Sequence, residues 1–271
     1  MQNKKKILPE IYNFLRPKQT KNLSRFGIKK DGGYVVETTV LDKVNHLVSF
    51  GMADEFSFEI DFLNYNKSNT LQIYDYAVNH KNYLSNIFKL LRRVITFRQS
   101  IKRLNQVILR YYNFLKFVNS KEVNFFPLKI TNQIKEKKEI DLHGVFSKLD
   151  KSINNIGLKI DIEGDEYKIL DKVVDNSNKI KFLIIEFHKI QENKKIFFDF
   201  VNELIKTFDI IHIHGNNHEL VLSDGFPNVI EISFVNKKNN LNYTNYPTSF
   251  PIERLDYPNN PLSPDIEINF S

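Results

Sequence analysis

Short apolar runs alternate with amphipathic helical patterns along most of this chain, and this alternation restricts the fold more than any other feature. Strands are predicted at residues 34–37, 46–50, 71–74, 125–130, 157–162, 180–187, 210–214 and 229–235. Helices are predicted at residues 7–15, 56–63, 142–149, 166–174 and 194–208. The pattern predicts an α/β fold, in which helices cover both faces of a mostly parallel sheet. A loop too short for a good helix joins the last two strands, which predicts that this final pair is antiparallel.

Composition excludes several classes of protein. Of the 271 residues, 41% are hydrophobic and 26% are charged, as in ordinary globular proteins. The absence of Cys excludes disulfides, thiolate metal sites and a cysteine nucleophile. Residues 1–6 are basic, but no apolar signal core follows them, and no run approaches the ~18 apolar residues of a membrane helix. We therefore expect a cytoplasmic protein, and a peripheral contact with the inner membrane stays open.

The positive charge of the chain is concentrated in one segment. The chain has 39 Lys+Arg and 32 Asp+Glu, which gives a formal net charge of +7. Residues 81–121, called here the basic insert, carry ten basic and no acidic side chains, which leaves −3 for the remainder. Apolar residues recur through the basic insert at helical spacing. The sequence therefore predicts one long or two shorter amphipathic helices, inserted after the strand at residues 71–74.

Several partners suit the basic insert. An anionic lipid surface, nucleic acid, a phosphorylated substrate or a second copy of the chain would each use it, and so would a hairpin with a solvated basic face. Nucleic acid is disfavoured because Tyr111, Tyr112 and Phe114 have the helical spacing of a core rather than of a base-stacking surface. We favour a substrate or subunit role, the latter through homo-oligomers.

The domain organisation is expected to be simple. Residues 1–271 should form a single domain that contains the basic insert. The tail, residues 246–271, is Pro-rich and is expected to be irregular and to lie over the domain.

Polar residues that directly follow strands are the first candidates for a site, because open parallel sheets bind ligands at the carboxyl ends of their strands. Gly51 follows the strand at residues 46–50, and its lack of a side chain lets a ligand approach the backbone. Amides near Ser57, where the next helix begins, can meet a carboxylate. Asp75 closes the next strand, where it either accepts hydrogen bonds from a ribose or begins a turn.

Acidic residues gather after the strand at residues 157–162. Helix capping accounts for Asp165 and Glu166, but Asp161 lies too far back in the strand to cap. Glu186 and His188 share one side of the following strand by its period of two. Asp161 and Glu186 should then face one crevice from adjacent strands. Together with His188 they form a candidate site for Mg²⁺, Mn²⁺ or Fe²⁺.

The strand at residues 210–214 also ends in polar residues. His212 and His214 are spaced as metal ligands could be, or they could bind sugar hydroxyls together with Asn216 and Asn217. For Asn217 we favour an ordinary polar turn. Hydrolases and nucleotidases are disfavoured because the chain has no Ser-His-Asp order, Walker loop or HExxH helix.

Five segments resemble FkbM-type methyltransferases, and they occur in the order typical of that family. Residues 158–170, with Lys159, Asp161, Glu163 and Gly164, resemble its acidic "KxDxEGxE" signature. The other four segments are residues 30–34 (a DGGY element), 49–51 with 57–59, 185–188, and 212–217. From residue 46 onward the predicted strands number seven, and seven strands with an antiparallel last pair are typical of the class I S-adenosylmethionine-dependent methyltransferase fold, which is Rossmann-like.

The resemblance implies S-adenosylmethionine as cofactor and O-methylation as reaction. Carried over, Gly51 would form the turn at the cofactor, Ser57 would meet its carboxylate and Asp75 its ribose. Asp161 would lie beside the transferred methyl group. The chain departs from the family where Met52, Ala53 and Asp54 replace further glycine, and in having the basic insert.

From these observations we expect an O-methyltransferase that acts on a sugar hydroxyl of a surface glycan or of a nucleotide-sugar precursor. A divalent metal at Asp161, Glu186 and His188 would lower the pKa of the hydroxyl, and without metal Asp161 or His188 would be the general base. The alternative is an RNA or protein methyltransferase that binds its anionic substrate through the basic insert.

Overall fold

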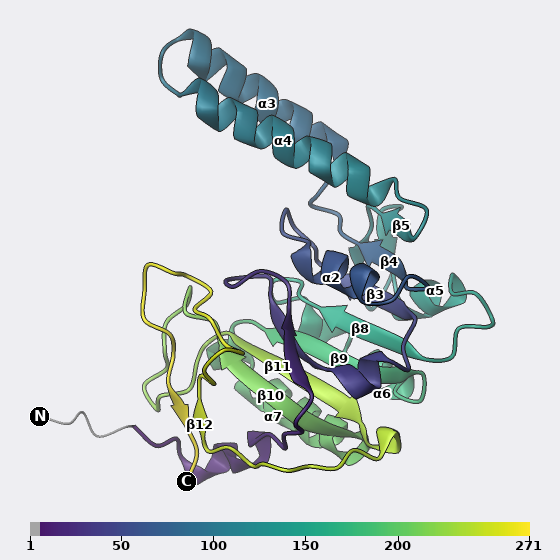
Figure 1. Cartoon of the computed structure of the whole chain (residues 1–271), viewed down its shortest axis with the longest axis vertical. Helices are drawn as coiled ribbons and strands as arrows, with labels where there is room; N and C mark the ends of the chain where they lie inside the picture. Colours follow the sequence, from purple (N-terminus) through teal and green to yellow (C-terminus); the bar gives the residue numbers. More distant parts are fainter. Residues whose placement is uncertain (1–5) are drawn as a thin grey trace, which may run out of the picture.

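A seven-stranded mixed sheet forms the centre of the structure, a computed structural model that describes residues 6–271 (Figure 1). Its strands, in spatial order, are β10 (Phe208–Gly215), β11 (Ile230–Asn236), β9 (Ile180–Phe187), β8 (Ile156–Ile160), β3 (His46–Phe50), β4 (Thr70–Tyr74) and β5 (Val123–Phe126). All neighbours are parallel except β11, which runs antiparallel to both β9 and β10. This strand order confirms the predicted class I methyltransferase fold.

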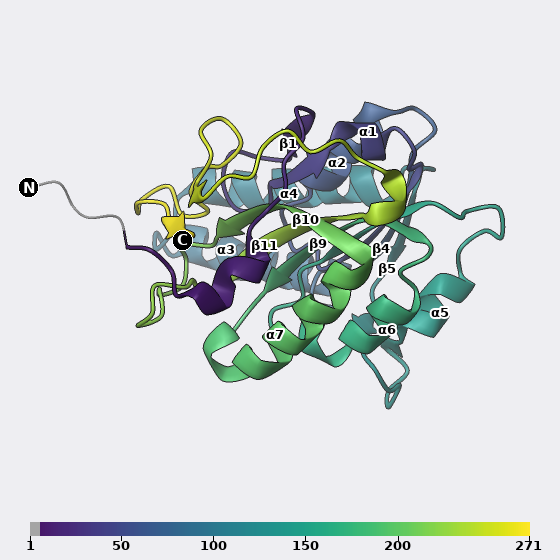
Figure 2. The same ribbon diagram turned by 90° about the horizontal axis from the view of Figure 1, so that it is seen from below.

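Helices cover both faces of the sheet (Figure 2). One face carries α5 (Leu142–Ser147), α6 (Leu170–Asp175) and α7 (Ile190–Thr207). The other carries α1 (Thr38–Leu41), α2 (Ser57–Tyr65) and the end of α4 nearest the sheet. Each face has its own apolar cluster, because β3, β4 and β9 offer apolar side chains to both sides of the sheet.

Smaller elements surround this sheet. They are the paired strands β1 (Leu23–Phe26) and β2 (Tyr34–Glu37), β6 (Lys129–Ile130) and β7 (Glu139–Ile140), and β12 (Ser249–Phe250) and β13 (Ile268–Asn269), with 3₁₀ helices at Glu10–Leu15, Glu166–Lys168 and Lys237–Asn239. The prediction of a helix at residues 7–15 was too long, because the helix begins only after Pro9. Of the basic N-terminal stretch, residues 1–5 lie outside the described residues.

Two predicted elements are divided in the structure. The strand predicted at residues 125–130 ends at Phe126, and β6 belongs to a separate two-stranded sheet. Pro127 lies between them and has no N–H for the ladder of the main sheet. The helix predicted at residues 166–174 is a 3₁₀ turn at Glu166–Lys168 followed by α6, and the side chain of Glu166 is buried.

The basic insert forms a hairpin of two helices, α3 (His80–Ile95) and α4 (Ile101–Val118), where the sequence had left open one long helix or two shorter ones. Figure 1 shows the two helices side by side, extending away from the sheet. Asn79 and Ser100 cap the helices by accepting hydrogen bonds from backbone N–H groups one turn on. Near the sheet, the ring of Phe117 stacks on that of Phe56, with centroids 4.7 Å apart. Among residues 6–271, no helix is both long and apolar enough to cross a membrane.

The Pro-rich tail is largely irregular, and specific polar contacts hold it on the domain. The Nε2 atom of His212 lies 3.0 Å from a carboxylate oxygen of Asp256, and that of His214 lies 3.0 Å from one of Asp265. The side-chain amide of Asn217 donates to backbone carbonyls of the tail. The sequence left His212 and His214 open as metal ligands or sugar-binding residues. In the structure both histidines contact the tail and hold it on the domain.

His46 makes the stability of the fold sensitive to acid. Burial lowers its pKa from 6.5 to about 4, and Nδ1 lies 2.7 Å from the hydroxyl of Thr70. Between these two pH values the unfolded chain binds a proton at this position and the folded chain does not, so stability decreases as the pH falls. We expect a loss of about 3 kcal/mol between pH 7 and pH 4 from this group.

Urea unfolding of wild type and His46→Leu at both pH values measures this effect. Because other groups titrate equally in both proteins, the difference between their pH-dependent losses isolates His46. Equal losses in the two proteins would contradict the prediction.

Candidate functional site

The candidate site lies where the chain leaves β3 and β8 toward opposite faces of the sheet. Gly51 follows β3 and Asp161 follows β8, and the N–H of Asp161 donates to the carbonyl of Phe50 over 3.0 Å. Gly51 has a φ of +72°, and a Cβ at this position would lie 1.6 Å from the carbonyl oxygen of Asp161. Glycine is therefore required here so that the ends of two neighbouring strands can approach each other. Such a divergence point is the usual ligand site of an open α/β sheet.

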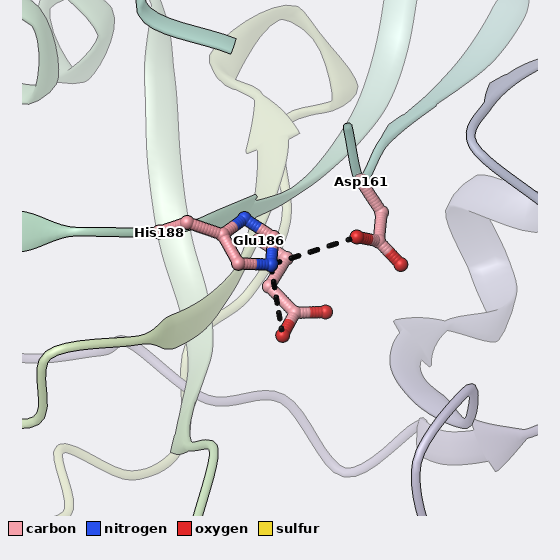
Figure 3. A group of neighbouring side chains, drawn as sticks. All are labelled: Asp161, Glu186 and His188. Atoms are coloured by element: carbon pink, nitrogen blue, oxygen red, sulfur yellow. Dashed lines mark ion pairs between the residues drawn. The ribbon is translucent and has the colours of Figure 1, made fainter. Parts of the chain in front are cut away.

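Asp161, Glu186 and His188 come together as the sequence predicted (Figure 3). Nε2 of His188 lies 3.9 Å from Oδ1 of Asp161 and 3.8 Å from Oε1 of Glu186. One potential ligand atom from each residue lies within 4.8 Å of the other two. Asp161 and Glu186 meet because β8 and β9 are parallel neighbours, with Ile160 opposite Ile185. Two carboxylates and one imidazole suit Mg²⁺, Mn²⁺ or Fe²⁺.

The electrostatics of this group favour the arrival of a cation. Burial raises the pKa of Glu186 well above its usual range, and the neighbouring Asp161 and Glu231 carboxylates raise it further. Burial alone would lower the pKa of His188, but the carboxylates of Glu166, Glu186 and Asp161 outweigh it and raise the pKa to about 9. Because the carboxylates crowd around the imidazole, a divalent cation could replace the protons held on Glu186 and His188, and its binding would release them.

Three further residues orient the carboxylates, and the sequence analysis gave none of them this role. The hydroxyl of Tyr34 donates to Oδ2 of Asp161 over 3.0 Å, and the amide of Asn216 donates to Oε1 of Glu186 over 2.7 Å. Lys159 is 3% exposed, and its Nζ lies 3.9 Å from Oδ2 of Asp161 and donates to the carbonyl of Gly51 over 2.7 Å. The resemblance of residues 30–34 and 212–217 to family motifs was the signal that could have identified Tyr34 and Asn216.

Glu166 lies in the first turn of the 3₁₀ helix, where the sequence placed an acidic residue, but its side chain positions His188. One carboxylate oxygen accepts from the N–H of His188 over 2.7 Å, and the other accepts from the N–H of Gly164 over 2.8 Å. The same side chain lies 3.4 Å from Nδ1 of His188, which has no hydrogen-bond partner among the described residues. A carboxylate behind an imidazole is the usual support of a metal-binding histidine. Asp165 occupies the N-cap position of this helix, but its side chain pairs with Lys129 and Lys168 and makes no cap hydrogen bond.

Backbone N–H groups of the protein itself occupy the carboxylate of Asp75. One carboxylate oxygen accepts from the N–H groups of Met52 and Ala53, and the other accepts from those of Ala77 and Val78. The four distances are 2.8–3.0 Å, and Asp75 is 6% exposed. A carboxylate offers about four acceptor positions, so a ribose would have to share or displace one of these bonds. The residue fixes the two loops that follow β3 and β4, which is the turn-forming role left open above.

Ser57 lies apart from Gly51 and Asp75. Its hydroxyl accepts from the N–H of Ile28 over 2.8 Å, and its own N–H donates to the carboxylate of Glu55 over 3.1 Å. Ser57 lines a cavity of about 510 Å³ whose walls include Glu55 and Arg110. The structure therefore does not bring all the predicted cofactor residues into one cavity.

Two more cavities adjoin the carboxylates. A cavity of about 180 Å³ is lined by Gly51, Asp75 and apolar residues that include Leu128 and Ile130. A second, of about 470 Å³, contains Glu186, His188 and Asn216 in its walls. Asp161 and Glu163 line both. Ligand sites usually measure ~300–1,000 Å³, so the smaller cavity suits a nucleoside portion, and the rest of S-adenosylmethionine would need the adjoining space.

No protein-family model and no curated protein matches the chain. Among the similar solved structures, the fibrillarin pre-rRNA processing protein of Methanococcus jannaschii is 9% identical, over 72% of this chain and 68% of its own, with a TM-score of 0.39. The precorrin-6y C5,15-methyltransferase of Geobacter metallireducens GS-15 is 12% identical, over 74% and 87%, with a TM-score of 0.36. TrmK of M. capricolum, in complex with S-adenosyl-homocysteine, is 15% identical, over 77% and 69%, with a TM-score of 0.35. The fold stated above rests on the strand order of the sheet and not on these similarities.

Proposed function

We propose that the chain is an S-adenosylmethionine-dependent O-methyltransferase with a divalent-metal site at Asp161, Glu186 and His188. The observation that carries the proposal is the convergence of these three side chains, with ligand atoms within 4.8 Å, at adjacent strand ends. They lie beside the cavity of Gly51 and Asp75, on the carboxyl edge of a class I methyltransferase sheet. Asp161 borders this cavity and the larger one, so it lies where donor and acceptor would meet.

In this mechanism the bound groups would supply the reacting chemistry, and the residues of the chain position them. S-adenosylmethionine would supply the methyl group, and the metal would supply a Lewis acid that lowers the pKa of an acceptor hydroxyl. Tyr34 and Lys159 hold Asp161 in place, which keeps its carboxylate at the border of the two cavities. In-line transfer depends on this alignment. In a metal-free reaction the proton would go to Asp161, because His188, with a pKa of about 9, already carries one at neutral pH.

A sugar hydroxyl of a surface glycan or nucleotide-sugar precursor is the acceptor that we propose. The 470 Å³ cavity is walled by amide, carboxylate and imidazole side chains, including Asn216, His218 and Asn228. Such groups match the many hydroxyls of a sugar. The second candidate is an RNA or protein methyltransferase, which is favoured by one observation: Arg110 of the basic insert lines the 510 Å³ cavity.

The test is a transfer assay with labelled S-adenosylmethionine against nucleotide sugars and glycan precursors. We expect transfer to a sugar, loss of transfer after exhaustive chelation, and recovery with Mg²⁺, Mn²⁺ or Fe²⁺. Activity that survives chelation unchanged would contradict the metal role. Salt-sensitive transfer to RNA, with none to sugars, would favour the second candidate.

A further inference from the structure

The hairpin of α3 and α4 exposes large apolar side chains that nothing in the described chain covers. On α3, Leu84, Phe88, Leu91 and Ile95 are 40–67% exposed and recur every three or four residues. They therefore form one stripe along the helix. At the turn between the helices, the side chain of Phe97 is 99% exposed. Exposed apolar area of this extent is uncommon on proteins that have no partner there.

α4 carries a matching stripe on the same side of the hairpin. Its exposed members are Ile101, Ile108 and Tyr112. Successive residues of an α-helix are about 100° apart around its axis. On this spacing the stripe of each helix lies roughly 90–100° around the axis from the face that packs against the other helix. Viewed from the N-terminus of each helix, the rotation has the same sense in both. Leu90 of α3 and Leu104 of α4 mark those packed faces. Because the helices are antiparallel, equal rotations bring both stripes to one side, and they form a continuous surface, called here the apolar face.

Basic side chains border the apolar face. Lys81 and Arg92 flank the stripe on α3, Lys116 flanks the one on α4, and Arg98 lies beside Phe97 at the turn. The sequence has no acidic residue between Asp75 and Glu122 to offset them. Long basic side chains can bury their methylenes in an apolar phase while the charge stays at its polar surface.

Charge decides which partner fits. A second copy docked face to face would set these four basic side chains against the same four of its partner, with no acidic residue of the hairpin to offset them, which opposes a dimer. Nucleic acid would satisfy the charge but would leave the apolar stripes in water. An anionic lipid surface satisfies both features, because acidic headgroups attract the basic border and the acyl boundary accepts the apolar side chains.

We propose that the hairpin docks on an anionic phospholipid membrane through its apolar face, with Phe97 and the neighbouring stripe residues in the acyl boundary. The hairpin lies at the surface and does not span the bilayer. This inference is independent of the catalytic proposal, because it rests on α3 and α4 and uses none of the candidate site residues. Arg110 and Asn113 of α4 also line the 510 Å³ cavity, so this cavity adjoins the hairpin.

The absence of tryptophan from the chain allows a direct test with a single fluorescent reporter. Phe97→Trp places it at the turn. Gln106→Trp is the matched control, because Gln106 is exposed but lies about 200° around α4 from Ile108. With phosphatidylcholine vesicles that contain phosphatidylglycerol, we expect a shift of the Phe97→Trp emission to shorter wavelength and little shift for the control. Pure phosphatidylcholine should give much weaker binding, and salt should weaken the anionic case.

Vesicle sedimentation measures affinity in the same system. The double variant Ile95→Ser, Phe97→Ser should bind at least about tenfold more weakly than wild type, and Gln106→Ser should bind equally well. Circular dichroism checks that the helices persist. The proposal is overturned if wild type stays in the supernatant with anionic vesicles, or if both reporters shift alike. It is also overturned if light scattering shows a dimer that Phe88→Ser dissociates.

Discussion

Asp161→Asn is expected to abolish divalent-metal binding and to lower methyl transfer by about 10²–10⁴-fold. The substitution keeps the size of the side chain and an oxygen that can accept from Tyr34, so the strand end should stay in place. It removes the negative charge that the metal and the acceptor proton would both use. Calorimetry with Mn²⁺ measures the first effect, and single-turnover transfer measures the second.

Glu163→Gln is the matched control for this prediction. Glu163 also approaches His188, at 3.6 Å from Nε2, but its side chain is 87% exposed. An exposed carboxylate has a small electrostatic effect, so this variant should bind Mn²⁺ within a few-fold of wild type. If Asp161→Asn retains full Mn²⁺ affinity, or if Glu163→Gln loses as much, the assigned ligand set is wrong.

The convergence of Asp161 and Glu186 could be predicted because it depends only on local rules. The apolar runs at residues 46–50, 157–162 and 180–187 identified buried strands, and the alternation of helices and strands made them parallel neighbours. Asp161 and Glu186, one position beyond the paired residues Ile160 and Ile185, then lie side by side. His188 joins them because a period of two places it on the side of Glu186.

The roles of Asp75, Ser57 and Glu166 could not be predicted in the same way. Each side chain contacts backbone groups of loops that meet it only after the chain has folded, such as Ile28 for Ser57 and His188 for Glu166. Loop geometry depends on contacts distant in sequence, and no periodic pattern encodes it. The same reason hid the partners of His212 and His214, which lie in the irregular tail.

Asp75→Ala is expected to lower the free energy of unfolding by about 3–5 kcal/mol. The substitution leaves the N–H groups of Met52, Ala53, Ala77 and Val78 without their charged acceptor. Hydrogen bonds to a charged group contribute ~1.5–3 kcal/mol each, but they are not additive and water reaches part of the loops. Urea unfolding measures the loss. Asp54→Ala is the control, because its exposed ion pair with Arg110 should contribute at most about 1 kcal/mol.

The rise in the free energy of unfolding that S-adenosylmethionine causes distinguishes a loop-anchoring role of Asp75 from a ribose-binding role. A ligand that binds only the folded state raises stability by about 2.7 kcal/mol at 100 times its dissociation constant. Ala53 and Ala77 line the same cavity as Asp75, so loss of their anchor should reduce the increment from S-adenosylmethionine together with the basal stability. If basal stability falls but the increment is unchanged, Asp75 is a loop anchor and contributes nothing to the ribose. If the increment falls while basal stability is unchanged, the four backbone bonds have little energetic weight and the carboxylate acts on the ribose directly.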